Sequence, residues 1–162
     1  MGVLNSIADL GLFKENISTA LFKSDEINEL LLGDTTGMSA SKKLIEFKEH
    51  VKSHLFVDDT IEDATSFIFY DVIIPHMSTQ VKNVQVWMYC VCHRDILDNY
   101  YKDGYHGNRV DILCEMVEKA LLSDQNFTRD FGIGQLQLGS LEIYNSRRFY
   151  GRSLVFEVPN FR

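Results

Sequence analysis

Hydrophobic positions recur at helical spacing in the first third of the chain. Over residues 17–32 they come every three or four residues, with Ser24 placed to cap a second short helix and Gly33 placed to end it. A loop rich in turn-forming residues follows over 33–43, and apolar residues then recur at three- and four-residue intervals over 44–55. The pattern predicts one or two short helices before the loop and a further helix after it.

The period of the pattern changes to two in the middle of the chain. Residues 67–74 are β-branched and aromatic, and the run stops at Pro75, which cannot donate a hydrogen bond to a central ladder. After a polar loop over 76–83, apolar and more polar positions alternate over 84–93. We predict two strands here, paired as a hairpin.

The second half of the chain repeats this change from helical to strand spacing. Asn108 is placed to cap a helix, and residues 110–122 carry a continuous apolar stripe. Alternation returns over 136–143 and 154–158, with a connection at 145–151. One helix followed by two more strands is therefore predicted.

No repeat, low-complexity tract or linker interrupts the pattern, so we expect a single domain over residues 1–162. It consists of a helical N-terminal region, residues 1–57, and a core over residues 60–162. The expected fold class is α+β: an antiparallel sheet with a packed central helix in the order α-β-β-α-β-β, preceded by the extra N-terminal helices.

Charge and cysteine usage narrow the classes of function. Sixteen basic and twenty-three acidic residues give a formal charge of −7, which argues against binding by neutralisation of nucleic-acid phosphates. The last sixteen residues are locally basic, and opposite charge at the two ends of a subunit suits head-to-tail assembly. Three cysteines are expected to be free thiols in a reducing compartment. No apolar run approaches the roughly 20 residues of a membrane span, and no export signal is expected.

The most metal-like cluster is Cys90, Cys92 and His93, since thiolates and an imidazole suit zinc. In a strand, however, Cys90 and Cys92 share one face while His93 points to the other, and a closed zinc site needs four ligands. We interpret the cysteines as small core residues and His93 as a strand-end residue. No cofactor or metal is expected.

An enzyme alternative rests on carboxylates. A magnesium-dependent nuclease could use the acidic segment Asp58, Asp59, Glu62 and Asp63 together with Asp71 of the next strand. The simpler interpretation is a solvated, capping acidic segment. The glycines of 131–139 (Gly132, Gly134 and Gly139) lack the spacing of a dinucleotide fingerprint or phosphate loop, and we expect them to shape a turn or bulge.

Arg and aromatic residues, which are enriched at the energetic centres of protein interfaces, gather in two predicted loops. The first contains Tyr100, Tyr101 and Tyr105, and the second contains Arg147, Arg148, Phe149, Tyr150 and Arg152. The alternative for both is an ordinary loop with partly buried rings. These residues are the predicted interface.

Four segments of the chain resemble a known family. The run 86–95, the helix entry 108–113, the stretch 131–138 and the ending 148–161 are similar in order and pattern to bacteriophage tail-terminator and head-to-tail joining (neck) proteins. The resemblance spans about residues 60–162, and the N-terminal 55 residues add little to it.

This resemblance implies a non-enzymatic virion subunit whose sheet assembles into a ring, commonly a hexamer. The ring would cap the tail tube and join it to the head connector or stopper protein, and DNA would pass through the lumen without specific binding. Its partners would be copies of itself, the tail-tube protein and the head connector, with assembly in the host cytoplasm and no membrane. The loop 145–152 and the tail 159–162, with Phe161 and Arg162, would be contacts. A connector adaptor or stopper, a tail-tube subunit, a small nuclease and a generic protein-binding module remain as alternatives.

Overall fold

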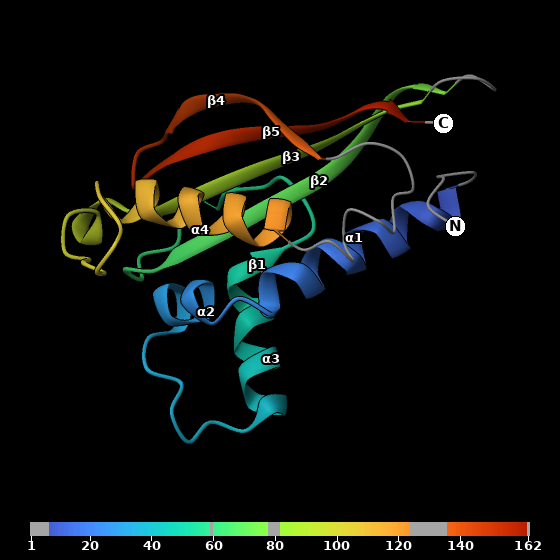
Figure 1. Cartoon of the computed structure of the whole chain (residues 1–162). Helices are drawn as coiled ribbons and strands as arrows, with labels where there is room; N and C mark the ends of the chain where they lie inside the picture. The colour runs from blue at the N-terminus through green and yellow to red at the C-terminus, as the bar shows by residue number, and fades with distance from the viewer. Residues whose placement is uncertain (1–6, 59, 78–81, 124–135, 162) are drawn as a thin grey trace.

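The computed structural model describes residues 7–58, 60–77, 82–123 and 136–161 as helices packed on one β-sheet (Figure 1). The described helices are α1 (Ile7–Phe22), α2 (Asp25–Leu32), α3 (Ala40–His50), the 3-10 turn η1 (Arg94–Ile96) and α4 (Arg109–Ser123). The strands are β1 (Val51–Lys52), β2 (Ser66–Met77), β3 (Lys82–His93), β4 (Gln137–Asn145) and β5 (Phe149–Phe161). The predicted α+β class is confirmed. None of the helices in these ranges is long and apolar enough to cross a membrane.

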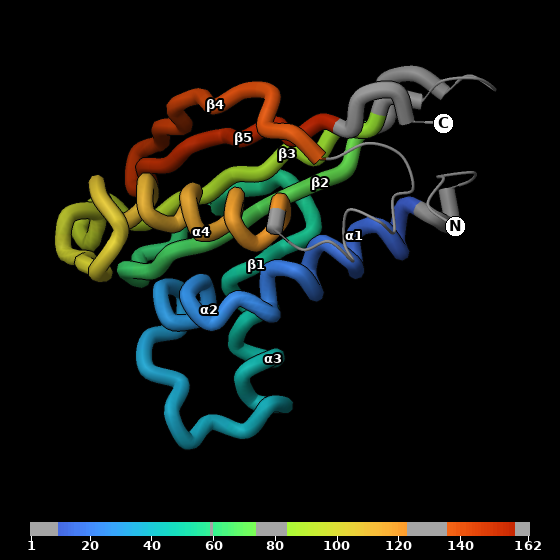
Figure 2. Tube along the Cα trace, in the orientation of Figure 1, coloured from blue at the N-terminus to red at the C-terminus, as the bar shows by residue number. Residues whose placement is uncertain are grey.

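The strands lie in the order β1-β2-β3-β5-β4. The pairs β2–β3, β3–β5 and β5–β4 are antiparallel, and the predicted hairpin of β2 and β3 is confirmed. The prediction of a wholly antiparallel sheet was wrong, because β1 pairs in parallel with β2 through Val51 and Ile68. β1 and β4 are therefore the two edges of the sheet, and α3, which leads directly into β1, lies at the opposite end of the molecule from β4 (Figures 1 and 2).

The helix predicted over 44–55 is shifted toward the N-terminus. α3 begins earlier because the Ser39 hydroxyl accepts the backbone N–H of a first-turn residue at 3.2 Å. It ends at His50, since Val51 takes up an extended conformation (φ −123°, ψ 113°) and enters the sheet. Leu55, the last residue of the helical pattern, instead packs on the far face of the sheet.

The predicted caps of α2 and α4 are confirmed. Ser24 accepts the N–H of Ile27 at 3.3 Å, and Gly33 ends α2 with φ +81°, a conformation that glycine adopts without steric cost. At α4, Asn108 Oδ1 accepts the N–H of Asp111 at 2.9 Å, while Asp111 Oδ2 accepts the N–H of Asn108 at 3.2 Å. This reciprocal pair satisfies two donors at the helix start.

β2 does not stop at Pro75 as predicted but continues to Met77. The pairing of β2 with β3 shifts register between Ile73 and His76, so Pro75 lies in an irregular part of the ladder. A proline is tolerated at such a bulge because its missing N–H costs no regular ladder bond there.

The connection between β4 and β5 is shorter than the predicted 145–151. Only residues 146–148 separate the strands, and the N–H of Ser146 donates to the carbonyl of Phe149 at 2.9 Å to close the turn. β5 therefore pairs with both β3 and β4 from its first residues.

The helices α1, α2 and α4 cover one face of the sheet, where the main core lies (Figure 1). Alternate residues of β3 point into this core and are essentially unexposed: Val84, Val86, Met88, Cys90 and Cys92. The predicted period of two is thus confirmed for β3.

A second, smaller cluster lies on the opposite face at one end of the sheet. Its buried residues are Phe67, Phe69, Val91 and Phe149, and the segment after β1 covers them with Leu55, Val57 and Ile61. The helices α1 and α2 and the segment that follows β1 therefore contact different faces of the sheet.

Candidate functional site

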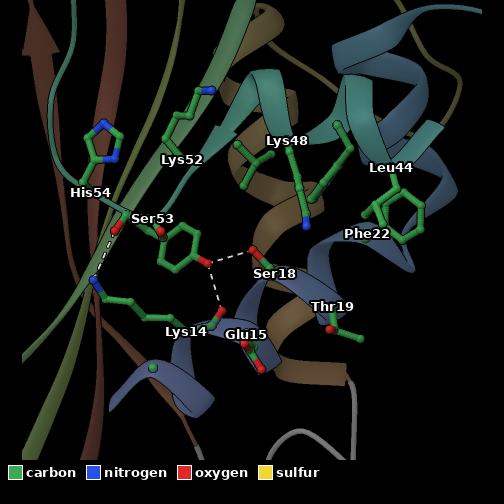
Figure 3. A pocket seen from close by; sticks show the side chains of 14 residues that line it. Lys14, Glu15, Ser18, Thr19, Phe22, Leu44, Lys48, Lys52, Ser53 and His54 are labelled. Carbon is green, nitrogen blue, oxygen red and sulfur yellow. Dashed lines mark hydrogen bonds between the residues drawn. The ribbon is translucent and has the colours of Figure 1, made fainter. Parts of the chain in front are cut away.

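A cleft of about 840 Å³ opens between α1, α3 and β1 (Figure 3). Its lining combines Lys14, Lys48 and Lys52 with the apolar side chains of Phe22 and Leu44. On a chain of net charge −7, this cleft gathers positive charge beside apolar surface.

The polar floor of the cleft holds α1 against β2. The Tyr70 hydroxyl donates to the carbonyl of Lys14 at 2.9 Å and lies 2.8 Å from Ser18 Oγ (Figure 3). Burial raises the pKa of Tyr70, so its hydroxyl stays protonated at neutral pH. Tyr70 and Ser18 therefore serve as a structural link between helix and strand.

The charged side chains of the cleft do not converge on that floor. Lys14 Nζ contacts Asp71 Oδ1 at 2.7 Å and donates to the carbonyl of Ser53 at 3.1 Å. Lys48 points into the cleft on the side of Ser18, whereas Lys52 and His54 point away from Ser18 (Figure 3). The cleft thus offers a basic rim more than a focused catalytic centre.

The three cysteines are free and buried. A hydrogen bond with the Cys114 thiol, together with burial, holds the pKa of Cys90 well above its ordinary value. Burial raises the pKa of Cys92 to about 12. His93 faces the other side of the sheet, with its ring 5.8 Å from that of Phe149. Cys90 and Cys92 therefore lie in the main core, on the opposite face of the sheet from His93.

The carboxylates of the nuclease alternative have separate local roles. Asp58 accepts the backbone N–H of the residue two positions on at 2.9 Å, and Glu62 lies 3.5 Å from an arginine of the β4–β5 turn. Asp71 contacts a lysine of α1, Asp63 is exposed, and Asp59 lies outside the described residues. Within the parts of the chain that the structure describes, no three His, Cys, Asp or Glu side chains gather in a way that could hold a metal ion.

The glycine-rich stretch is described only at its end. Gly139 lies where the pairing of β4 with β5 shifts between Leu138 and Ser140, which confirms the expected bulge at this residue. Gly132 and Gly134 lie outside the described residues.

The tyrosines of the first predicted interface loop are placed very differently. Tyr105 is buried and donates from its hydroxyl to Glu26 Oε1 at 2.8 Å, so the prediction of a surface contact was wrong for it. Tyr100 is half-buried beneath the guanidinium of Arg109, which lies 4.9 Å from the ring centroid. Tyr101 is 81% exposed and is the member of this loop that remains open to a partner.

The second predicted loop is also used largely within the subunit. Phe149 is fully buried in the smaller cluster, so its prediction as an interface residue was wrong. Arg152 Nε contacts a carboxylate of α4 at 3.1 Å, Arg148 contacts Glu62, and Tyr150 is half-buried, while Arg147 is exposed. The side chain of Phe161 and the whole of Arg162 lie outside the described residues.

A surface that the sequence patterns did not single out lies along the edge strand β4. Leu141 and Ile143 are 49% and 64% exposed. They pair with Leu154 and Arg152 of β5, whose side chains face α4, so both point to the α4 side of the sheet. Apolar side chains on an open sheet edge are a common feature of assembly surfaces.

A groove of about 340 Å³ separates this row from α4. Its α4 wall carries Asp111, Glu115 and Glu118, which lie on one side of the helix at spacings of four and three residues. Its floor contains Leu141 and Leu154. This α4–β4 groove is therefore acidic on one side and apolar on the other.

A family model described as YomW matches residues 15–158. The chain belongs to the YomW family. The family takes its name from a gene of the Bacillus phage SPBc2, so the protein is phage-related. The comparison with curated proteins gave no match.

The YomW match includes both surfaces described above. It begins within α1 and runs through α3, the cleft, α4 and most of β5. The N-terminal helical region, residues 1–57, added little to the resemblance to phage neck proteins. Most of this region nevertheless lies within the part of the chain that the YomW family model matches. The spacing of Asp111, Glu115 and Glu118 in the sequence is enough to predict an acidic side of α4. That this side lies next to the exposed Leu141 and Ile143 could not be predicted, because it depends on the pairing of β4 with β5.

Proposed function

We propose that this phage-related protein is a structural subunit of the virion: a tail-terminator or neck ring subunit that caps the tail tube and joins it to the head connector, leaving a passage for DNA. The observation that carries the proposal is the edge strand β4, which presents Leu141 and Ile143 to solvent. An open edge with apolar side chains is a template for pairing with another chain.

The arrangement of the sheet favours a ring over a simple dimer. Its two edges differ, because β4 spans Gln137–Asn145 whereas β1 spans only Val51–Lys52 and continues from α3. Contacts between unlike ends of successive copies are head-to-tail, and such contacts close into rings when the rotation between copies allows it. The position at the neck, rather than in an adaptor, stopper or tail tube, follows from the resemblance of residues 60–162.

Removing the protein from a phage that encodes it tests this function. We expect filled heads and tails that fail to join, counted by negative-stain electron microscopy of lysates, and restored joining when the wild-type chain is supplied in trans. Labelled protein should be found between head and tail of the rescued particles. Joined, infectious particles formed without the protein would exclude this role.

A further inference from the structure

A second exposed apolar site lies at the end of the molecule opposite β4. On α3, Ile45 is 62% exposed and Leu44 is 38% exposed. Lys42 and Lys48, both exposed, lie three residues before and after Ile45 on the same side of the helix. Figure 1 shows α3 projecting from the sheet on the β1 side, away from α4 and β4.

Positive charge is concentrated at this end. Residues 1–81 contain six lysines, no arginine and thirteen carboxylates, yet residues 42–52 contain four of these lysines and only two glutamates. Lys43 contacts Asp25 at 3.6 Å, whereas Lys48 and Lys52 line the rim of the cleft. The N-terminal half of the chain is acidic, but α3 projects from it with exposed lysines beside the exposed Leu44 and Ile45. We call this projecting surface of α3 the knob.

The α4–β4 groove has the complementary chemistry. Glu115 and Glu118 line the α4 wall, Leu141 lies in the floor, and the exposed Ile143 lies two residues further along β4. Asp111, the third carboxylate, is already paired with Arg152 at 3.1 Å. Glu115 and Glu118 are therefore the carboxylates of this wall that would pair with a lysine or arginine of a bound partner.

We propose that α3 of one copy docks into the α4–β4 groove of the next copy, with Ile45 against Leu141 and Ile143 and with Lys48 facing Glu115 and Glu118. This contact rests on the proposed function and names the subunit interface of the ring. One chain carries both halves at opposite sheet edges, so every copy offers a free knob and a free groove. Repetition of the same contact gives a head-to-tail series that can close.

A second copy fits the groove better than an unrelated partner because this one sequence carries both the lysines and exposed apolar residues of α3 and the glutamates and exposed apolar residues of the groove. Opposite charge across a contact fixes register and disfavours wrong partners. Two grooves meeting face to face would instead place Glu115 and Glu118 against their own copies, which is repulsive.

The apolar half of the contact is tested with Ile45→Ala and a matched control. Phe56 is as exposed as Ile45, at 62%, but lies on the segment after β1. We expect Ile45→Ala to weaken self-association by about tenfold in sedimentation velocity, as removal of a central apolar anchor does, while Phe56→Ala associates like the wild type. Equal thermal unfolding of the two variants would show that folding is intact.

The charged half is tested by reversal. One variant carries Lys48→Glu and Lys52→Glu, and the other carries Glu115→Lys and Glu118→Lys. Each variant alone should associate at least about tenfold more weakly than the wild type, since like charges then meet at every contact. An equimolar mixture should recover assembly, because each knob then meets a groove of opposite charge.

The outcomes separate this interface from the proposed function. Wild-type assembly that is unchanged in the Ile45 and charge-reversed variants overturns the α3 contact and leaves the neck role standing. Variants that still self-associate but no longer support the joining of heads to tails would assign the groove to a tail-tube or connector protein. That result would also overturn the α3 contact between copies. A wild-type chain that is monomeric both alone and on tail tubes also overturns the α3 contact. The neck role is tested separately, by whether heads and tails join when the protein is removed.

Discussion

At the scale of single residues, Gly151 determines how closely β5 approaches β3. A Cβ atom at this position would overlap the carbonyl oxygen of Cys90 and lie 2.5 Å from Val91 Cγ1. A Cβ atom at Gly11, in α1, would meet no other segment of the described chain within 4 Å. We expect Gly151→Ala to lower the free energy of unfolding by about 2–3 kcal/mol, as overpacking does, and Gly11→Ala to raise it by about 0.5–1 kcal/mol.

Urea denaturation followed by circular dichroism measures both changes, with Gly11→Ala as the control for the substitution itself. The same shift of the midpoint in both variants would mean that β5 can move away from β3 without loss of pairing.

The residues that could be predicted from the sequence are those whose partners are close in the chain. Ser24 and Asn108 cap helices through groups three residues away, so local order was enough to identify them. Tyr105 and Phe149 were misassigned to a surface because their partners are remote: the hydroxyl of Tyr105 bonds to Glu26, 79 residues earlier. Composition suggests that a side chain can serve an interface, but the fold decides whether it is free to do so.

At the scale of elements, α3 has an inner and an outer side with different roles. Phe47 is 1% exposed and meets the ring of Phe22 edge-on at 5.1 Å, whereas Ile45 is 62% exposed. We expect Phe47→Ala to lower the free energy of unfolding by about 3–5 kcal/mol and Ile45→Ala to change it by less than about 0.5 kcal/mol.

Both values should be measured by chemical denaturation at a protein concentration low enough to keep the chain monomeric. A large destabilisation by Ile45→Ala would place its side chain in the fold of the subunit, and the loss of association in this variant would then need another explanation.

The elements that were predicted well are those whose periodicity is local. The hairpin of β2 and β3 and the helix α4 followed directly from the spacing of apolar residues. The end of α3 did not, because Val51 fits the helical spacing as well as it fits a strand, and its pairing with Ile68 decides between them. Similarly, the passage of β2 through Pro75 depends on the bulge against β3. The same long-range pairing creates the α4–β4 groove, and so the candidate site could be predicted only in part.

At the scale of the whole molecule, two electrostatic effects oppose each other. The net charge of −7 makes copies repel one another at a distance, while Lys48 facing Glu115 and Glu118 would attract them at contact. Near physiological salt the screening length is about 8 Å, so the long-range repulsion is largely removed while contacts at short range persist. The local complementarity should therefore govern association under these conditions.

This balance predicts the salt dependence of self-association. Raising NaCl from about 0.15 M to about 0.5 M should weaken wild-type association, because the added ions screen the remaining contact pairs. Lys48→Met removes the charge that faces Glu115 and Glu118 but keeps an apolar stem, so its dissociation constant should change less steeply with salt, as measured by sedimentation equilibrium. Apolar burial alone is not weakened by such salts. Association of the wild type that strengthens over the same range would show that Leu141 and Ile143 dominate the contact and that the lysine and glutamates contribute little to it.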